Sequence, residues 1–247
     1  MALYLTEGDI RQVLTLQDAL SAVEDAHRWH ATGDAIDTPR ARSRTPTSAL
    51  HILHGAVLPL GVIGYKSYTT SREAARFWVH LFDAATGRAL AVIEADYLGM
   101  MRTGAAGGLA ARLLSNPASK VAGVFGAGWQ AQSQIAALCE VRDLDEIQVF
   151  ARKRDKLEAF CAEQSARLDR KIRPAASAEE MVKSADIVVT ITTASEPLFD
   201  GRWLKPGAHV TGAGSNALIR REIDETVIRR AAVVAVDARA TALRLRG

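Results

Sequence analysis

The sequence predicts an α/β protein in which a smaller α+β domain precedes a doubly wound parallel sheet. Strand-like and helical segments alternate through the second half of the chain, as a parallel sheet with crossover helices requires. A glycine-rich turn joins the first of these strands to the helix that follows. The first half instead has short strands separated by turns, which favours antiparallel pairing. The strands expected in the second half are 121–125, 146–150, 171–175, 186–191, 208–213 and 232–236.

The glycine-rich turn carries the most specific local signal. An apolar run, Val121–Phe125, stops at a glycine pair, and a helix is expected over 129–141. The spacing Gly126-x-Gly128-x-x-Ala131 fits a dinucleotide-binding turn. Gly126 would allow the tight turn, Gly128 would let a pyrophosphate approach the backbone, and Ala131 would let the helix pack closely. The turn therefore predicts a Rossmann-type domain with phosphates at the helix N-terminus.

Composition narrows the class of protein. The chain has 247 residues, of which 48% are hydrophobic and 24% charged, as expected for a globular protein with a real core. Its net charge of +3 is slight and no basic cluster is interleaved with aromatics, so nucleic acid is not an expected partner. Without a signal-peptide-like start or a membrane-length apolar run, a cytoplasmic protein is expected. The two cysteines, Cys139 and Cys161, suggest neither a disulfide framework nor a metal site.

The first half begins with a helical pattern and continues as strands. Residues 6–32 are expected to be helical, because Thr6-x-x-Asp9 resembles a capping box and apolar residues recur at helical spacing up to a break at Gly33. Strands are expected at 49–53, 62–68 and 77–82, with a hairpin turn over 83–87.

A helix rich in small residues marks the expected domain boundary. Arg102 opens this helix, which is expected to run to about Leu114 before Ser115-Asn-Pro breaks it. Small side chains on one face would allow close packing at a domain junction. The boundary is placed there, giving domains 1–115 and 116–247.

Six motifs, in this order, resemble the ornithine cyclodeaminase/mu-crystallin family over nearly the whole chain. They are Pro39-Arg40, Lys66, Leu81-Phe-Asp-Ala-Ala-Thr-Gly87, Arg102-Thr-Gly-Ala-Ala106, Gly126-Ala-Gly-Trp-Gln-Ala131 and Pro206-Gly-Ala-His-Val-Thr-Gly-Ala-Gly214. The resemblance implies a homodimer of two-domain subunits. The N-terminal domain would supply substrate contacts and dimerisation, and the Rossmann domain would hold NAD(H) or NADP(H). The family includes cyclodeaminases, ketimine and pyrroline-2-carboxylate reductases, alanine dehydrogenases and a hormone-binding crystallin.

The sequence departs from the family pattern at three places. Relatives continue beyond the last residue here, closing the sheet and returning a helix to the first domain, so the chain is expected to be C-terminally short. Cyclodeaminases carry a catalytic aspartate where this chain has Asn216, and an amide cannot act as general base. The second Rossmann strand is followed by Ala151 and Arg152 in place of an acid, which favours a 2′-phosphate and predicts NADP(H) over NAD(H).

The substrate site is expected to be cationic. The resemblance gives Arg102 the role of gripping a substrate carboxylate, beside the cofactor, and gives Lys66 the role of holding it and polarising the reacting group. Either Arg40 or Arg42 could complete the anion pocket. Asn216 could orient water or substrate by hydrogen bonding. Further acids considered for the imine proton are His51, His54, Glu94 and Asp96, which the sequence does not rank.

The cofactor contacts follow from the turn and from the family match. The amides near Trp129 and Gln130 should meet the pyrophosphate. Thr192 matches a family contact beside the cofactor, and Gly214 to Asn216 match the wall near the nicotinamide. The full set is Arg102, Gly126, Gly128, Trp129, Gln130, Ala151, Arg152, Thr192, Ala213, Gly214 and Ser215.

Together these residues and the family resemblance predict an NAD(P)H-dependent oxidoreductase that reduces a small α-imino acid, such as a cyclic ketimine of the pyrroline-2-carboxylate type, to an L-amino acid. Three alternatives stay open. One is an ornithine cyclodeaminase that recycles bound NAD, another is a non-catalytic NADPH-dependent ligand-binding protein of crystallin type, and the third is an inactive truncated product.

Overall fold

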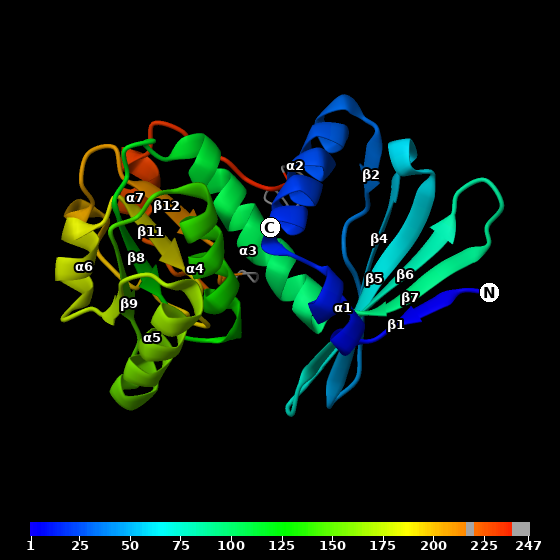
Figure 1. Cartoon of the computed structure of the whole chain (residues 1–247), viewed down its shortest axis with the longest axis horizontal. Coiled ribbons are helices and arrows are strands. Elements are labelled where there is room, and N and C mark those ends of the chain that lie inside the picture. Colours follow the sequence, from blue (N-terminus) through cyan, green and yellow to red (C-terminus); the bar gives the residue numbers. More distant parts are fainter. Residues whose placement is uncertain (216–219, 239–247) are drawn as a thin grey trace. The chain divides into compact units, whose positions relative to one another are not determined.

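The computed structural model describes residues 1–215 and 220–238. The chain divides into two compact units, Met1–Arg102 and Thr103–Gly247 (Figure 1). The first is α+β with a mostly antiparallel sheet, and the second is a parallel α/β unit. The predicted fold class is confirmed.

The first unit contains a seven-stranded sheet in the order β1-β7-β6-β5-β4-β2, with β3 also paired to β4. All pairs are antiparallel except β1 with β7. The predicted hairpin turn joins β6 to β7, with the Asp83 carboxylate accepting the Thr86 amide at 2.8 Å. The strands are β1 Leu3–Leu5, β2 Ala35–Asp37, β3 Ala41–Arg44, β4 Ser48–Val57, β5 Val62–Ser71, β6 Ala75–Asp83 and β7 Ala89–Glu94.

The helical region before Gly33 is two helices, not one. Helix α1 spans Glu7–Val13 and α2 spans Leu16–Thr32, and each begins with a capping box. The capping box at Thr6 was predicted. The second, at Thr15, starts a new helix because Leu14 and Thr15 are extended, so the prediction of one helical stretch is wrong at this point. A short 3₁₀ turn, η1, covers Leu58–Leu60.

Helix α3, Asp96–Leu114, begins six residues before the position expected from the sequence. The carboxylate of Glu7 accepts hydrogen bonds from the backbone amides of Asp96 at 2.6 Å and Tyr97 at 3.1 Å. This distant side chain therefore satisfies the first amides of α3, as a cap does. Arg102 lies inside the helix, and its placement at a helix start is corrected.

The small residues of α3 pack within the second unit. A Cβ added to Gly104 would lie 2.5 Å from the Ser133 side chain, and one on Gly108 would lie 2.8 Å from Ala137, both in helix α4 (Trp129–Val141). Side chains here would push the two helices apart. The division therefore lies after Arg102, whereas the sequence placed it at residue 115.

The second unit is a five-stranded, all-parallel sheet in the order β10-β9-β8-β11-β12. Buried residues of α3, α4 and α5 form the core on one face, and those of α6, α7 and η2 form the core on the other. This is the doubly wound arrangement that the alternating pattern predicted. The elements are β8 Val121–Phe125, β9 Glu146–Phe150, α5 Arg154–Leu168, β10 Ile172–Pro174, α6 Ala178–Ser184, β11 Ile187–Thr190, η2 Gly201–Trp203, β12 His209–Gly212 and α7 Glu225–Arg230.

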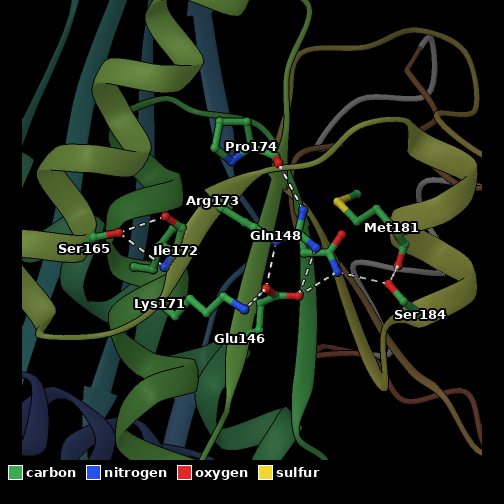
Figure 2. Close-up of polar contacts among 9 residues, drawn as sticks. All are labelled: Glu146, Gln148, Ser165, Lys171, Ile172, Arg173, Pro174, Met181 and Ser184. Atoms are coloured by element: carbon green, nitrogen blue, oxygen red, sulfur yellow. Dashed lines mark hydrogen bonds and ion pairs between the residues drawn. The ribbon is translucent and has the colours of Figure 1, made fainter.

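An ion-pair cluster closes the β9–β10 edge of this sheet (Figure 2). The Glu146 carboxylate accepts from the Arg173 guanidinium at 2.7 Å and pairs with the Lys171 amine at 2.6 Å. The Gln148 amide donates to both Glu146 and the Ser184 hydroxyl, each at 3.1 Å. Hydrogen bonds from Arg173 and then Lys171 lower the pKa of Glu146 to about 2. The cluster ties the edge strand to the unit and lies away from the β8–β11 boundary.

The strand predicted at 232–236 is not found among the described residues. Val233, Val234 and Val236 are exposed, and no backbone ladder of the described chain includes them. β-Branched residues favour a strand only where a neighbouring strand supplies hydrogen bonds and a packed face. Among the helices of the described residues, none combines the length and the apolar character needed to cross a bilayer.

Candidate functional site

The turn after β8 has the geometry that the glycine spacing predicted. Gly126 has a φ of +116°, which side-chain-bearing residues rarely adopt, and a Cβ there would lie 2.5 Å from the Ile191 carbonyl oxygen. Its amide donates to the Phe150 carbonyl at 2.9 Å, which ties the turn to β9. Gly126 therefore fits between the ends of β9 and β11 because it has no side chain.

Helix α4 begins directly after this turn, at Trp129. Its N-cap, Gly128, has extended backbone and no side-chain cap, and the space around its missing Cβ is open to 4 Å. The side-chain oxygen of Gln130 is buried without a hydrogen-bond partner. An uncapped helix N-terminus beside open space fits an anionic phosphate, which would meet the first amides of the helix.

The end of β9 presents cations and no acid. Ala151 packs against the core of the sheet, and Arg152 is exposed beside Lys153, the N-cap of α5. The end of β9 adjoins the glycine turn, since Phe150 pairs with Phe125. Arg152 thus follows the strand that pairs with β8 and lies near the glycine turn, and its role toward a 2′-phosphate stays a prediction.

The ends of β11 and β12 are joined by a carboxylate that the sequence analysis missed. Glu222 is 2% exposed and accepts from the Thr192 amide at 2.6 Å and the Gly214 amide at 2.7 Å. Ala213 donates to the Thr190 carbonyl at 2.8 Å, continuing the β11–β12 ladder. An acid within Arg-Arg-Glu-Ile-Asp resembles a solvated charge run, so the sequence offered no signal for this role.

Two further predicted residues, Ser215 and Asn216, follow β12 in the sequence. The Ser215 hydroxyl donates to the Arg220 carbonyl at 2.6 Å, so its side chain serves the loop. Asn216, predicted as a catalytic residue, lies outside the described residues.

In the first unit, Lys66 and Arg40 each lie within reach of the same aromatic ring, that of Tyr68. His51, Tyr68 and Phe77 face one another across β4, β5 and β6, with ring centroids 4.2 Å and 4.8 Å apart. The Lys66 ammonium lies 5.5 Å from the Tyr68 centroid, and the Arg40 guanidinium lies 5.8 Å from the same centroid. Such contacts with ring faces stabilise a cation in a partly desolvated place.

The electrostatics of Lys66 single it out. Burial, followed by the charges of Arg102 and then Arg40, lowers its pKa to about 8. The Nε of Arg40 is buried and has no hydrogen-bond partner. Three cations therefore converge in the first unit, and an anion among them would relieve the repulsion. Lys66, Arg40 and Arg102 thus lie close enough for their charges to interact, an arrangement that would suit a carboxylate, and their role in binding substrate stays a prediction.

The other candidates from the sequence have structural partners. The Nε of Arg42 donates to Nδ1 of His51 at 3.3 Å, so Nε2 carries the proton and faces the Thr70 hydroxyl at 3.1 Å. Burial and the charges of Arg42, Arg40 and Arg44 lower the His51 pKa, which keeps the ring neutral. His54 is exposed on the opposite face.

The two acids before α3 are also structural. Glu94 accepts from the Tyr4 hydroxyl and the Glu7 amide, each at 2.9 Å. Asp96 accepts from the Phe77 amide at 3.0 Å. Their carboxylates fasten β1, α1 and β6, so proton transfer by these groups is not what the geometry favours.

The fold and these residues define a class: a Rossmann-type dinucleotide-binding unit joined to an α+β unit that carries a cluster of cations. The chain belongs to the ornithine cyclodeaminase/mu-crystallin family, whose model matches residues 2–245.

Three similar proteins carry informative names. Mouse (Mus musculus) ketimine reductase mu-crystallin is 36% identical over 169 residues, which are 68% of this chain and 52% of the mouse protein. A probable ornithine cyclodeaminase from Bordetella pertussis Tohama I is 34% identical, with a TM-score of 0.92 over 99% of this chain and 78% of that one. Delta(1)-pyrroline-2-carboxylate reductase from Thermococcus litoralis, in complex with NADH and L-proline, is 28% identical, with a TM-score of 0.87 over 92% and 73%.

Proposed function

We propose that this protein reduces a small α-imino acid, such as a cyclic ketimine of the pyrroline-2-carboxylate type, to an L-amino acid with NAD(P)H. The observation that carries the proposal is the cation cluster in the first unit, in which the pKa of Lys66 falls to about 8. The named activities of the Thermococcus and mouse relatives support the same reaction class.

The residues of the cluster divide the work by their chemistry. Arg40 and Arg102 carry permanent charges suited to the substrate carboxylate, and a guanidinium can bind it at two points. Lys66, with its pKa lowered to about 8, can give a proton to the imine nitrogen and recover it from water. A bound reduced nicotinamide supplies the hydride that reaches the imine carbon. One hydride at carbon and one proton at nitrogen convert C=N to CH–NH.

The cofactor proposal rests on the second unit. The turn at Gly126 and Gly128 and the N-terminus of α4 would hold the pyrophosphate, with the backbone near Trp129 and Gln130. Arg152, exposed after an alanine at the end of β9, favours NADP(H) because its guanidinium can pair with a 2′-phosphate. Thr192, Ala213 and Gly214 would line the other half of the site.

A homodimer is proposed through one face of the seven-stranded sheet. On this face Tyr65 stacks on His80, with centroids 4.5 Å apart, and lies near Phe82. Residues in register share a face, and this face carries several of the exposed apolar side chains of the unit. These are Tyr4, Ile36, Leu50 and Ile63.

A second candidate is an ornithine cyclodeaminase, which the Bordetella relative's name favours. Asn216 argues against it, because an amide cannot serve as the base that the family's aspartate supplies. A further candidate is a non-catalytic ligand-binding protein of crystallin type that needs NADPH; the mouse relative's name includes both crystallin and ketimine reductase.

One experiment separates these candidates. The purified chain is incubated with NADPH or NADH and a panel of cyclic and linear α-imino acids, and nucleotide oxidation is followed by absorbance. In parallel, ornithine is supplied without added nucleotide and ammonia is measured. We expect oxidation with a cyclic ketimine and no ammonia. Ammonia release would favour the cyclodeaminase, and tight NADPH binding without turnover of any imine would favour the binding protein.

A further inference from the structure

A buried carboxylate lies at the carboxyl ends of β11 and β12. The Glu222 side chain accepts four hydrogen bonds, two at each oxygen. Oε1 accepts from the Thr192 amide at 2.6 Å and the Thr192 hydroxyl at 2.7 Å. Oε2 accepts from the Gly214 amide at 2.7 Å and the Thr190 hydroxyl at 3.1 Å. Every one of these donors comes from the end of a neighbouring strand or the residues just after it.

The carboxylate fixes how closely the two strand ends approach. Thr190 pairs with Gly212, so Thr192 and Gly214 are the positions at which the chains leave the ladder. A Cβ on Gly214 would lie 2.5 Å from each Glu222 oxygen and would also collide with the Thr192 carbonyl. Glu222 thus takes the place of ladder hydrogen bonds where the ladder stops.

The segment that carries Glu222 is anchored without its carboxylate. The Glu222 carbonyl accepts from the Leu198 amide at 2.8 Å. The next residue, Ile223, packs into the core, and Asp224 caps α7. The four hydrogen bonds of the Glu222 side chain therefore link the two strand ends and are not needed to hold the segment that carries Glu222.

The strand order indicates which part of a dinucleotide would lie against Thr192 and Gly214. The order reverses between β8 and β11, and a ligand in such a sheet lies at the carboxyl ends beside that reversal. In this fold, the adenosine ribose of the dinucleotide lies near the end of the second strand, here β9, where Arg152 lies. The opposite, nicotinamide-bearing half then falls toward β11 and β12.

We propose that Glu222 is a positioning residue that holds Thr192 and Gly214 as the wall of the nicotinamide half-site. The proposal rests on the nucleotide-dependent function proposed above. It concerns the shape of the wall, with no contact between Glu222 and substrate or cofactor.

Replacement by glutamine tests the idea with little change of shape. The glutamine NH₂ group cannot accept a hydrogen bond, so it faces either the Thr192 amide or the Gly214 amide, donor against donor. A hydroxyl can rotate away, but a backbone amide cannot. An unsatisfied amide of this kind should weaken binding of whatever the wall contacts by about tenfold.

The experiment compares whole and half cofactors on the full-length chain. Dissociation constants of NADPH and NADH are measured by fluorescence, and those of 2′,5′-ADP and ADP-ribose, which lack nicotinamide, by calorimetry. For Glu222→Gln we expect the dinucleotide constants to rise about tenfold and the fragment constants to change less than twofold. Asp186→Asn is the matched control, because that carboxylate also accepts backbone amides, from Lys120 and Val121 at 2.9 Å, at the amino end of β11. Asp186→Asn should change neither the dinucleotide constants nor the fragment constants by more than about twofold.

The outcomes are distinct. If both kinds of constant rise equally, or if neither changes, Glu222 has no positioning role and the inference is overturned. Should Glu222→Gln fail to fold, Thr190→Val serves, since it removes one donor to Oε2 from a fully buried site and should weaken dinucleotides several-fold relative to fragments. A wild-type chain that binds no nucleotide overturns the proposed function and this inference with it.

Discussion

Replacing Lys66 with methionine should stabilise the protein while removing its activity. Burial of the Lys66 ammonium in the folded state, followed by the charges of Arg102 and Arg40, lowers its pKa from 10.5 to about 8. That difference corresponds to about 3 kcal/mol of folding free energy, at about 1.4 kcal/mol for each tenfold change in proton affinity. Relaxation and solvent reduce the figure, so the methionine variant should gain about 1–3 kcal/mol at pH 7.

The sign and the pH window follow from linkage. Below pH 8 the amine is protonated in both the folded and the unfolded chain, so the whole unfavourable term acts on the folded state. Between pH 8 and 10.5 the folded chain releases its proton first, and stability recovers as pH rises. The advantage of Lys66→Met should therefore be full at pH 7 and should shrink steadily above pH 8.

Urea unfolding at a series of pH values measures this, with reductase activity recorded on the same samples. Loss of the general acid should lower kcat by about 10²- to 10⁴-fold. Lys66→Arg is the charge-preserving control and should gain no stability, because a guanidinium stays charged. Lys156→Met, at an exposed lysine, should stay within about 0.5 kcal/mol of the wild type. If Lys66→Met destabilises the chain, or stabilises it equally at every pH, the reasoning is refuted.

Three further predictions concern specificity, acid stability and assembly. Arg152→Glu should lower the NADPH/NADH preference by at least about tenfold in kcat/KM, and an unchanged ratio would remove Arg152 from the 2′-phosphate site. Glu146→Gln should cost about 1–2 kcal/mol at neutral pH. The Glu146 contribution is present above pH 4.5 and is lost as pH falls toward 2, so the urea midpoints of variant and wild type should converge in acid; parallel midpoints would contradict the ion-pair account. Phe82→Arg should convert a dimer to monomer by light scattering, and a dimeric variant would place the interface elsewhere.

The local features of the fold were readable from the sequence, because their causes are local. The turn at Gly126 needs a positive φ and a following helix, and both follow from a few neighbouring residues. The capping box at Thr6 and the alternation of strands and helices are signals of the same kind. The cations Lys66 and Arg40 could be proposed from motif positions, but their common position near the Tyr68 ring depends on the register of β5 with its neighbours.

The features that the sequence missed depend on contacts distant along the chain. Helix α3 begins early because Glu7, far before it, caps its first amides. Glu222 was missed because its donors lie at Thr190, Thr192 and Gly214 and become neighbours only when β11 and β12 pair. The valines after residue 232 show the reverse, since strand propensity alone produced no ladder in the described chain.

Isotope transfer tests the proposed reduction most directly. The chain is supplied with pyrroline-2-carboxylate and NADPH, or NADH, that carries deuterium at C4 on either face of the nicotinamide, and the proline formed is analysed by mass spectrometry and chiral chromatography. The proposed reaction predicts L-proline with one deuterium on the α-carbon from one of the two faces. Proline without deuterium from either face, or no proline with any nucleotide, would contradict it.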